Sequence, residues 1–231
     1  MQKLSGVAAL LAIVFGIYYI VTLQSQTTIT TDLAQKEIIA LPDQSQVTLN
    51  AVTSLSYSKN SWDQKREVSL QGEAFFEVAK GAKFDVVTQD GIVTVLGTSF
   101  NVKQRDQFFE VSCYEGLVRV LYKGKEIQLP AGNTFRLAHT KETKGTISGS
   151  GPQWMTNRSV FSKVAILEVF KELERQYDVT IDYSNIDSSV LFSGGFEHSE
   201  LTDALTAITA PLRLKYKIEN NREVVIYDTT D

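Results

Sequence analysis

Residues 93–102 of the chain have the sequence Val-Thr-Val-Leu-Gly-Thr-Ser-Phe-Asn-Val, and the fold of the surrounding region depends on this segment. Apolar side chains occur at both odd and even positions from Ile92 to Val102, which predicts a strand that is buried on both faces. Gly97 interrupts the pattern, and the hydroxyl of Thr98 follows it directly. A glycine inside a strand indicates a bulge, a kink or the close approach of another backbone. The pair is therefore either a kink alone or a kink that also carries a reactive peptide bond.

The segment belongs to a long β-rich region at residues 36–140, in which apolar and polar residues alternate. Turn-forming pairs such as Asp90-Gly91 and Lys123-Gly124 separate the alternating runs. Many short strands with frequent turns are typical of a β-sandwich, a jelly roll or a wrapped β-structure, so an all-β domain is expected here. The expected strands cover residues 37–40, 46–49, 54–57, 67–72, 74–79, 84–88, 92–96, 98–104, 108–114, 116–122, 125–129 and 134–138.

A second domain follows a segment at residues 141–153, whose glycines and serines predict a flexible linker. Between residues 154 and 231, two segments have helical periodicity and four have strand periodicity. This order predicts a small α+β domain, and an exposed sheet edge in such a domain can accept a strand from a partner. The expected strands are residues 179–183, 190–196, 213–218 and 222–227.

The first expected helix of this domain begins after Ser162, a plausible N-cap, and the second lies between Ser199 and Pro211. One apolar stripe on the first helix is expected to face the core, and a charged face is expected to point into water. The stripe consists of Ile166, Val169, Phe170, Leu173 and Tyr177, and the charged face of Glu168, Lys171, Glu172, Glu174 and Arg175.

The composition excludes several classes of function. The 231 residues carry a net charge of −4, whereas a nucleic-acid-binding protein would present a basic face, so no nucleic-acid partner is expected. The two histidines, His139 and His198, lie far apart and have no neighbouring cysteine, so neither a metal nor a cofactor is expected. Cys113 alternates with apolar residues, which favours a buried small hydrophobe over a redox sensor.

No enzymatic activity on a substrate is expected. The chain has no Gly-x-Ser-x-Gly, Walker A, Cys-x-x-Cys or His-Glu-x-x-His motif. Glu73 and Glu77 fall on one face of an expected strand. Paired carboxylates can serve acid/base chemistry or bind a metal, but a solvated or salt-bridged strand face is the favoured interpretation.

The N-terminus contains an uncharged apolar run at residues 4–23. Twenty helical residues rise about 30 Å, which matches the hydrocarbon core of a bilayer. Lys3 precedes the run, so residues 1–3 are expected to form a cytoplasmic stub, with the rest of the chain outside the inner membrane. A polar tether is expected at residues 24–35. The alternative, a cleaved signal peptide, is disfavoured because the apolar run is long and no small-x-small site follows it promptly.

Three ordered segments of the β-rich region resemble the periplasmic domain of FecR-type sigma-factor regulators. They are Leu-Pro-Asp-Gln-Ser-Gln-Val-Thr-Leu-Asn at 41–50, Arg-Glu-Val-Ser-Leu-Gln-Gly-Glu-Ala-Phe-Phe-Glu-Val at 66–78, and Val-Leu-Gly-Thr-Ser-Phe-Asn-Val at 95–102. Leu-Glu-Arg-Gln-Tyr at 173–177 and Phe-Ser-Gly-Gly-Phe at 192–196 resemble the C-terminal domain of such proteins from Bacteroidetes-like bacteria, which is related to the secretin and TonB short N-terminal fold.

This resemblance implies a single-pass protein of the bacterial inner membrane that acts in signal transduction. Such proteins sense the signalling domain of a TonB-dependent outer-membrane transporter in the periplasm. Inside the cell they control an extracytoplasmic-function sigma factor as anti-sigma factors or activators, and site proteases link the two sides. In some members the Gly-Thr of the third segment is a self-cleavage site, which would make Thr98 the nucleophile and Gly97 the acyl donor.

The sequence departs from the family pattern in three places. Only residues 1–3 precede the expected membrane helix, so this sequence is expected to lack the family's cytoplasmic sigma-binding domain. A fragment, a wrongly assigned start and a separately encoded inner half are the three explanations that stay open. Gln44 replaces the usual glycine of Leu-Pro-Asp-Gly-Ser, and Val164-Ala165 replaces the usual Pro-Leu. The first departure leaves an alternative function open, a membrane-tethered periplasmic scaffold without sigma-factor control. A sugar-binding or hydrolytic β-domain is the least favoured hypothesis.

Overall fold

The computed structural model describes residues 11–16, 26–138, 140–184, 186–220 and 222–228. Residues 11–16 are helical, and the rest of the predicted membrane helix at 4–23 lies outside the described residues, as do residues 1–3. Among the residues described, no helix combines the length and the apolar character that crossing a membrane requires.

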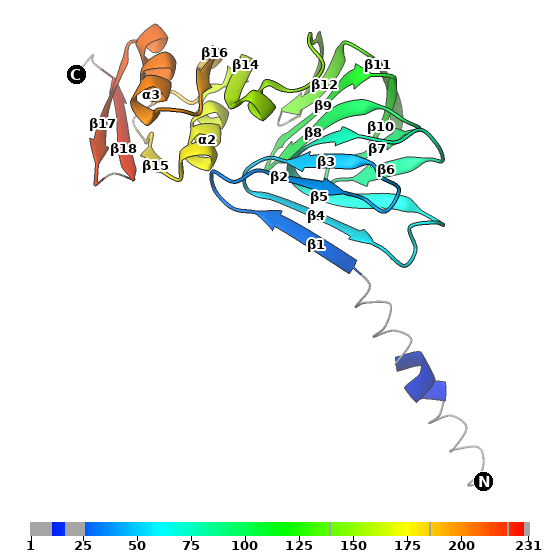
Figure 1. Cartoon of the computed structure of the whole chain (residues 1–231). Helices are drawn as coiled ribbons and strands as arrows, with labels where there is room; N and C mark the ends of the chain where they lie inside the picture. The colour runs from blue at the N-terminus through cyan, green and yellow to red at the C-terminus, as the bar shows by residue number, and fades with distance from the viewer. Residues whose placement is uncertain (1–10, 17–25, 139, 185, 221, 229–231) are drawn as a thin grey trace.

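Thirteen strands of the described chain form one curled, hydrogen-bonded sheet, which confirms the β-rich prediction (Figure 1). The strands are β1 (Gln26–Thr31), β2 (Glu37–Ala40), β3 (Gln46–Leu49), β4 (Thr53–Ser58), β5 (Arg66–Glu77), β6 (Phe84–Val87), β7 (Ile92–Val95), β8 (Ser99–Arg105), β9 (Phe108–Glu115), β10 (Leu117–Tyr122), β11 (Lys125–Pro130), β12 (Asn133–Ala138) and β13 (Lys141–Thr146).

Strand β5 joins the two halves of this sheet. Its first part pairs with β4 and β6, and its second part pairs with β3 and β8. Between the two parts, Gly72 has φ +120°, and a Cβ at this position would lie 2.7 Å from the Cα of Thr53. Only glycine fits this close approach. The sequence predicted two strands, at 67–72 and 74–79, where the structure has one strand that bends.

The two halves of the sheet enclose one hydrophobic core. Aromatic side chains meet across it: the rings of Tyr122 on β10 and Phe135 on β12 lie 6.2 Å apart, as do those of Phe76 and Phe84. Each fully buried side chain of this size stabilises the fold by about 1.5–3 kcal/mol relative to exposure. Cys113 is fully buried in the same core, as predicted.

The segment at 93–102 forms two strands, which agrees with the separate strands expected at 92–96 and 98–104. The chain does not run through Gly97 as one strand that is buried on both faces. β7 pairs with β6 and β10, and β8 pairs with β5 and β9. The chain crosses from one half of the sheet to the other between them, and the buried apolar positions change from odd (Val93, Val95) to even (Phe100, Val102). Leu96, at the crossing, is 63% exposed. Apolar residues at both odd and even positions therefore reflect two strands in succession, each of which carries its buried apolar side chains on one face.

Strands also occupy part of the predicted tether and part of the predicted linker. β1 covers residues 26–31 and pairs with β4, and β13 covers residues 141–146 and pairs with β12. Both are strands at the margin of the sheet with largely exposed side chains, which explains their polar composition. Their β-branched threonines suit an extended backbone.

The C-terminal part contains two helices between small sheets (Figure 1). β14 (Arg158–Ala165) pairs with β16 (Leu191–Glu197), and β18 (Glu223–Asp228) pairs with β15 (Thr180–Asp182) and β17 (Leu214–Glu219). The helices are α2 (Ile166–Tyr177) and α3 (Leu201–Thr209), with the 3-10 turns η1 (Gln153–Thr156) and η2 (Ala210–Leu212). Their apolar stripes form a second hydrophobic core, as predicted.

The predicted N-caps of both helices are wrong. Ser162 lies inside β14, and the residue that precedes α2 is Ala165, whose side chain makes no capping bond. The backbone replaces the cap, because the N–H of Ile166 donates to the carbonyl oxygen of Val190 at 2.9 Å. At α3 the cap position is Glu200, one residue beyond Ser199.

Candidate functional site

The predicted self-cleavage pair, Gly97 and Thr98, lies at the crossing between β7 and β8. Gly97 has φ +148°, and a Cβ there would lie 2.7 Å from the Cα of Lys80, so the expected close approach of another backbone is present. Thr98 is 4% exposed, and its Oγ1 donates to the carbonyl oxygen of Leu117 at 3.4 Å. The steric requirement accounts for the glycine without any chemistry. Cleavage at this bond stays a prediction.

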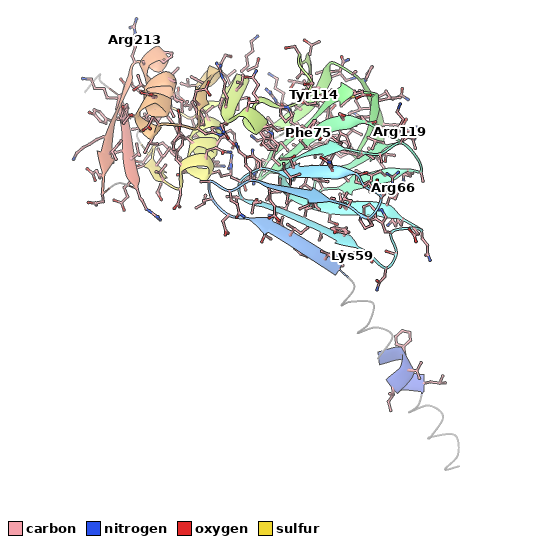
Figure 2. The ribbon with its side chains drawn as sticks, in the orientation of Figure 1. Lys59, Arg66, Phe75, Tyr114, Arg119 and Arg213 are labelled. Atoms are coloured by element: carbon pink, nitrogen blue, oxygen red, sulfur yellow. The ribbon has the colours of Figure 1, made fainter. Side chains whose placement is uncertain are left out.

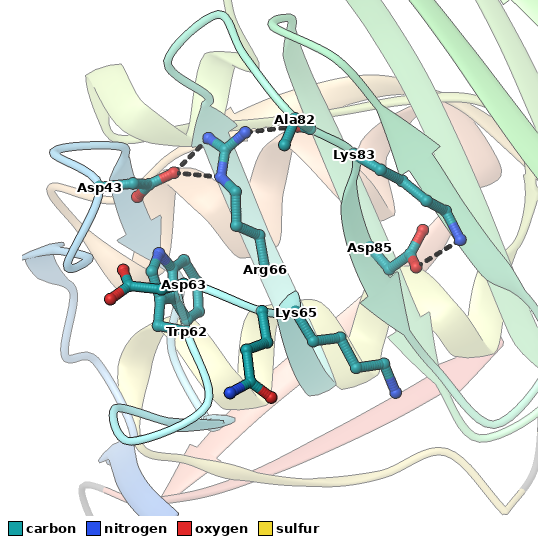
Figure 3. Close-up of a pocket in the computed structure, with 9 residues that line it drawn as sticks. Asp43, Trp62, Asp63, Lys65, Arg66, Ala82, Lys83 and Asp85 are labelled. Atoms are coloured by element: carbon teal, nitrogen blue, oxygen red, sulfur yellow. Dashed lines mark hydrogen bonds and ion pairs between the residues drawn. The ribbon is translucent and has the colours of Figure 1, made fainter.

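Gln44, which stands where the family usually has glycine, lies in a turn whose Asp43 is bound by Arg66 (Figure 3). The Arg66 guanidinium bonds to Asp43 and donates to the carbonyl oxygens of Ala79 (3.0 Å) and Ala82. Burial acts to raise the pKa of Asp43, but hydrogen bonds from Arg66 and Ser45 outweigh it and lower the pKa. Gln44 adopts φ +67°, the left-handed conformation that glycine favours, so the turn keeps a glycine-like backbone.

A hollow of about 390 Å³ lies beside this clamp. Its charged lining residues include ion pairs, such as Lys83 with Asp85 at 2.7 Å and Arg66 with Asp43 (Figure 3). These cations and carboxylates neutralise one another's charge. The hollow is therefore lined by side chains that hold neighbouring segments together.

A cluster of buried polar and charged side chains lies between the two domains, and we call it the interdomain junction. It consists of Asn50, Glu73, Asn101, Lys103 and Arg105 from the β domain and of Glu172, Arg175 and Gln176 from α2. On the β-domain side, Glu73 is 4% exposed and accepts hydrogen bonds from the side-chain amides of Asn50 (3.1 Å) and Asn101 (3.0 Å). Lys103, directly opposite on β8, lies 3.2 Å from the same carboxylate.

Glu172 is the matching carboxylate on α2 and is 2% exposed. It accepts from Lys103 Nζ at 3.0 Å, from Arg175 Nη2 at 2.9 Å and from Gln176 Nε2 at 2.9 Å. The Gln176 amide also donates to Asn50 Oδ1 at 2.9 Å, which connects the helix to the β domain a second time. Lys103 therefore bridges one carboxylate of each domain.

The charges of the junction stabilise one another in spite of their burial. Burial acts to raise the pKa of Glu172, but Lys103, Arg175 and Arg105 hold it well below its usual value. Burial acts to lower the pKa of Lys103, but Glu172 and then Glu73 outweigh it and leave the pKa raised. Both groups are therefore charged at neutral pH. Removing one partner of such a pair leaves a buried charge without compensation.

Arg105 fixes the β-domain loop beneath the junction. Its Nη2 donates to the carbonyl oxygen of Ala51 at 2.6 Å, and its Nη1 donates to that of Val52. Burial and then the charge of Arg175 lower the pKa of Arg105 to about 10, which still leaves the guanidinium charged at neutral pH.

Apolar side chains of the β domain also pack against the C-terminal domain. Phe108, the first residue of β9, packs into the core of the C-terminal domain, and the guanidinium of Arg136 lies 5.4 Å from its ring. Trp154 is 5% exposed, and its Nε1 donates to Asn101 Oδ1 at 3.3 Å. Within the β domain, the rings of Phe75 on β5 and Tyr114 on β9, both labelled in Figure 2, pack edge to face at 5.7 Å. A polar interface between two units that each have a core is typical of domains that move relative to one another.

A second polar contact lies beside the junction. Lys36, between β1 and β2, donates from Nζ to the carbonyl oxygen of Trp154 (2.6 Å) and to Asn157 Oδ1 (2.8 Å). The same nitrogen lies 3.3 Å from His198 Nδ1, and His198 Nε2 lies 2.9 Å from Ser159 Oγ. Burial and then Lys36 lower the pKa of His198 from 6.5 to about 4. Neutral His198 therefore accepts from Lys36.

Sequence reasoning missed this junction. Glu172 and Arg175 were expected on the wet face of the helix, but that face docks against the β domain. Glu73 forms the expected salt bridge but is buried, whereas Glu77 is exposed, so the two do not act as a pair. One signal was present in the sequence: Glu73 and Lys103 are charged residues close to core side chains of the same strands, such as Phe76 on β5 and Phe100 on β8.

Comparison with known proteins gives matches over both domains. The model of the family described as FecR protein matches residues 27–119, and the model described as FecR, C-terminal matches residues 158–226. Two crystal structures of a candidate anti-sigma factor from Parabacteroides distasonis, at 2.50 and 1.65 Å resolution, are each 28% identical to this chain. They match with TM-scores of 0.81 and 0.80, over 89% and 88% of this chain and 100% of theirs. No curated protein matches the chain.

The fold and the junction define a protein of two domains, in which a small α+β domain docks on a curled β domain through buried polar contacts. The β domain corresponds to the FecR model and the α+β domain to the FecR C-terminal model. The chain belongs to the FecR family.

Proposed function

We propose that this protein is a signal-transducing regulator of the anti-sigma-factor type. It senses the signalling domain of a TonB-dependent outer-membrane transporter and controls an extracytoplasmic-function sigma factor. Membership of the FecR family supports sigma-factor regulation. The observation that carries the proposal is the similarity to the Parabacteroides distasonis candidate anti-sigma factor, which extends over both domains and 89% of the chain.

The proposal places the protein in the bacterial inner membrane. Residues 4–23 cross the membrane once with the N-terminus inside, and the two folded domains lie in the periplasm. The support is the uncharged apolar run of bilayer length and the lysine that precedes it. Site proteases then connect the periplasmic event to the sigma factor.

The proposed contact surface for the transporter is the edge of β16. Within the described chain β16 pairs with β14, and no charged residue occurs from Leu191 to Phe196. Leu191 is 61% exposed. Charged side chains discourage strand addition at a sheet edge. β17 carries Lys215 and Lys217 within the strand, whereas the one charged residue of β16 is Glu197 at its end. A strand of the signalling domain can therefore add to β16.

A binding measurement tests the partner and the edge together. The full chain, purified in detergent, is titrated with the signalling domain of the transporter that is encoded beside it. We expect binding by the wild type and a loss of roughly tenfold or more for Leu191→Lys, because a charge at an interface centre costs over 1.4 kcal/mol. Leu121→Lys, at an exposed leucine of β10, is the matched control and should bind normally. No binding by the wild type would favour the scaffold alternative.

The proposal includes processing at Gly97–Thr98. The Oγ of Thr98 attacks the carbonyl carbon of Gly97, the C–N bond breaks, and the amino group of Thr98 is released as an ester forms. Water then hydrolyses the ester to the Gly97 carboxylate and the Thr98 hydroxyl. Support comes from the family resemblance and from the left-handed backbone of Gly97.

A further inference from the structure

The loop at residues 32–36, which we call the strap, joins β1 to β2 and touches the C-terminal domain at two points. The N–H of Ala34 donates to the carbonyl oxygen of Arg175, near the end of α2, at 2.8 Å. Lys36 Nζ donates to Trp154 and Asn157, as described above. Both contacts join positions more than 110 residues apart in the chain, so they exist only while the C-terminal domain is docked.

Apart from its contacts with the C-terminal domain, the strap is held by few hydrogen bonds among the described residues. Residues 32–35 are exposed, and two of their hydrogen bonds are internal: Asp32 N–H to Gln35 Oε1 (2.8 Å) and Gln35 N–H to the Asp32 carbonyl (3.2 Å). One bond to the β domain runs from the N–H of Val52 to the carbonyl oxygen of Asp32, at 3.2 Å.

Strand β1, which the strap continues, is also weakly held. In the part of the chain described, β1 pairs along one side, with β4. Its side chains alternate between exposed and half-buried until Thr31, which is 5% exposed and bonds to the carbonyl oxygen of Asn50 at 2.6 Å. Elements with few buried contacts and one hydrogen-bonded neighbour open at the lowest free energies.

The contacts that dock the C-terminal domain on the β domain are of a type that can open and close. The interdomain junction is held mainly by ion pairs and amide hydrogen bonds, and buried ion pairs contribute little net stability because they must be desolvated. The connection between the domains, residues 147–152, contains Gly149 and Gly151 and has no helix or strand. Glycine-rich connections absorb the backbone rotations of hinge motion.

We propose that the docked C-terminal domain holds β1 in place through the strap, with Lys36 as the positioning residue, and that undocking releases β1. The strap thereby relays the state of the C-terminal domain to the strand that directly follows the N-terminal segment. This inference concerns the chain alone and does not depend on the proposed control of a sigma factor. It goes beyond that function by naming the contact through which the two ends of the chain communicate.

Hydrogen exchange on the full chain, without any partner, tests the relay. Lys36→Met removes the ammonium and keeps a side chain of similar length. We expect the amides of β1 to exchange roughly tenfold faster or more, because the substitution removes about one charged hydrogen bond. The amides of β8 and β9 should exchange as in the wild type. Asn157→Gly removes one acceptor and keeps the left-handed backbone (φ 59°), so it should shift β1 in the same direction but less.

Two further variants keep the test decisive. Lys59→Met, at an exposed lysine near the other end of the β1–β4 pair (Figure 2), is the matched control and should leave β1 unchanged. Glu172→Gln disturbs docking without touching the strap and should accelerate β1 exchange together with that of α2. Unchanged β1 exchange in Lys36→Met, or equal acceleration of β1, β8 and β9, would overturn the proposal. So would Glu172→Gln with faster α2 exchange and unchanged β1 exchange.

Discussion

A buried carboxylate that faces buried cations cannot become neutral without leaving those cations uncompensated, and Glu172 is in this position. It accepts from Lys103 and Arg175 and is 2% exposed. We expect Glu172→Gln to lower the free energy of unfolding of the full chain by about 3–5 kcal/mol, measured by denaturant titration.

The control for this prediction is on the same helix. Glu168 forms an i,i+3 pair with Lys171 at 3.2 Å nearer the surface, so Glu168→Gln should cost less than about 1 kcal/mol. A double variant, Lys103→Met with Glu172→Leu, removes both charges and should recover much of the loss. Equal effects of the two single substitutions would contradict the ionic account of the junction.

His198 gives the protein a defined response to pH. Its pKa is lowered from 6.5 to about 4 on folding, so between these values the unfolded state binds more protons. Stability should therefore fall as pH decreases from 6.5 to 4, by no more than about 2 kcal/mol once solvent screening of this half-exposed group is allowed for. His198→Gln can still accept from Lys36 and should flatten the profile in this window. The depressed pKa of Glu172 acts at lower pH, where its contribution is lost below its usual value.

At the scale of elements, the crossing at Gly97–Thr98 permits a direct test of cleavage. We expect wild-type protein from native membranes to give two fragments on a denaturing gel and Thr98→Ala to give one band. Because β8 pairs with β5 across the bond, the fragments should migrate together in a native gel. Thr94→Ala, on β7, is the control and should cleave normally. An intact wild-type chain would rule cleavage out.

Sequence periodicity predicted most of these elements, and its errors have physical causes. Alternation located the strands of the β domain because strands such as β4 and β10 bury one face and expose the other more. It separated β7 from β8 at Gly97, but it interpreted apolar residues at both odd and even positions as burial on both faces. A change of parity between two strands gives the same pattern when the partner strands are unknown. It missed β1 and β13, because marginal strands bury few side chains. It misplaced Ser162, because a backbone carbonyl supplies the bond that a cap would provide.

At the scale of the molecule, the docking of the two domains could not be predicted from the sequence. Gln176 bonds to Asn50 across 126 residues, and the charged face of α2 has the same composition as a solvated face. The two hydrophobic cores could be inferred from their stripes, but Phe108 belongs to the β domain in sequence and to the C-terminal core in space. Contacts of this kind depend on the fold as a whole.

Regulation of a sigma factor by this protein is tested by transcription from a promoter that depends on the sigma factor encoded beside this gene. It is measured with and without the transporter's substrate, in cells that have or lack the protein. We expect a response to substrate that disappears when the protein is deleted and returns when the full chain is supplied. A response that is unchanged by the deletion would contradict regulation of the sigma factor by this protein.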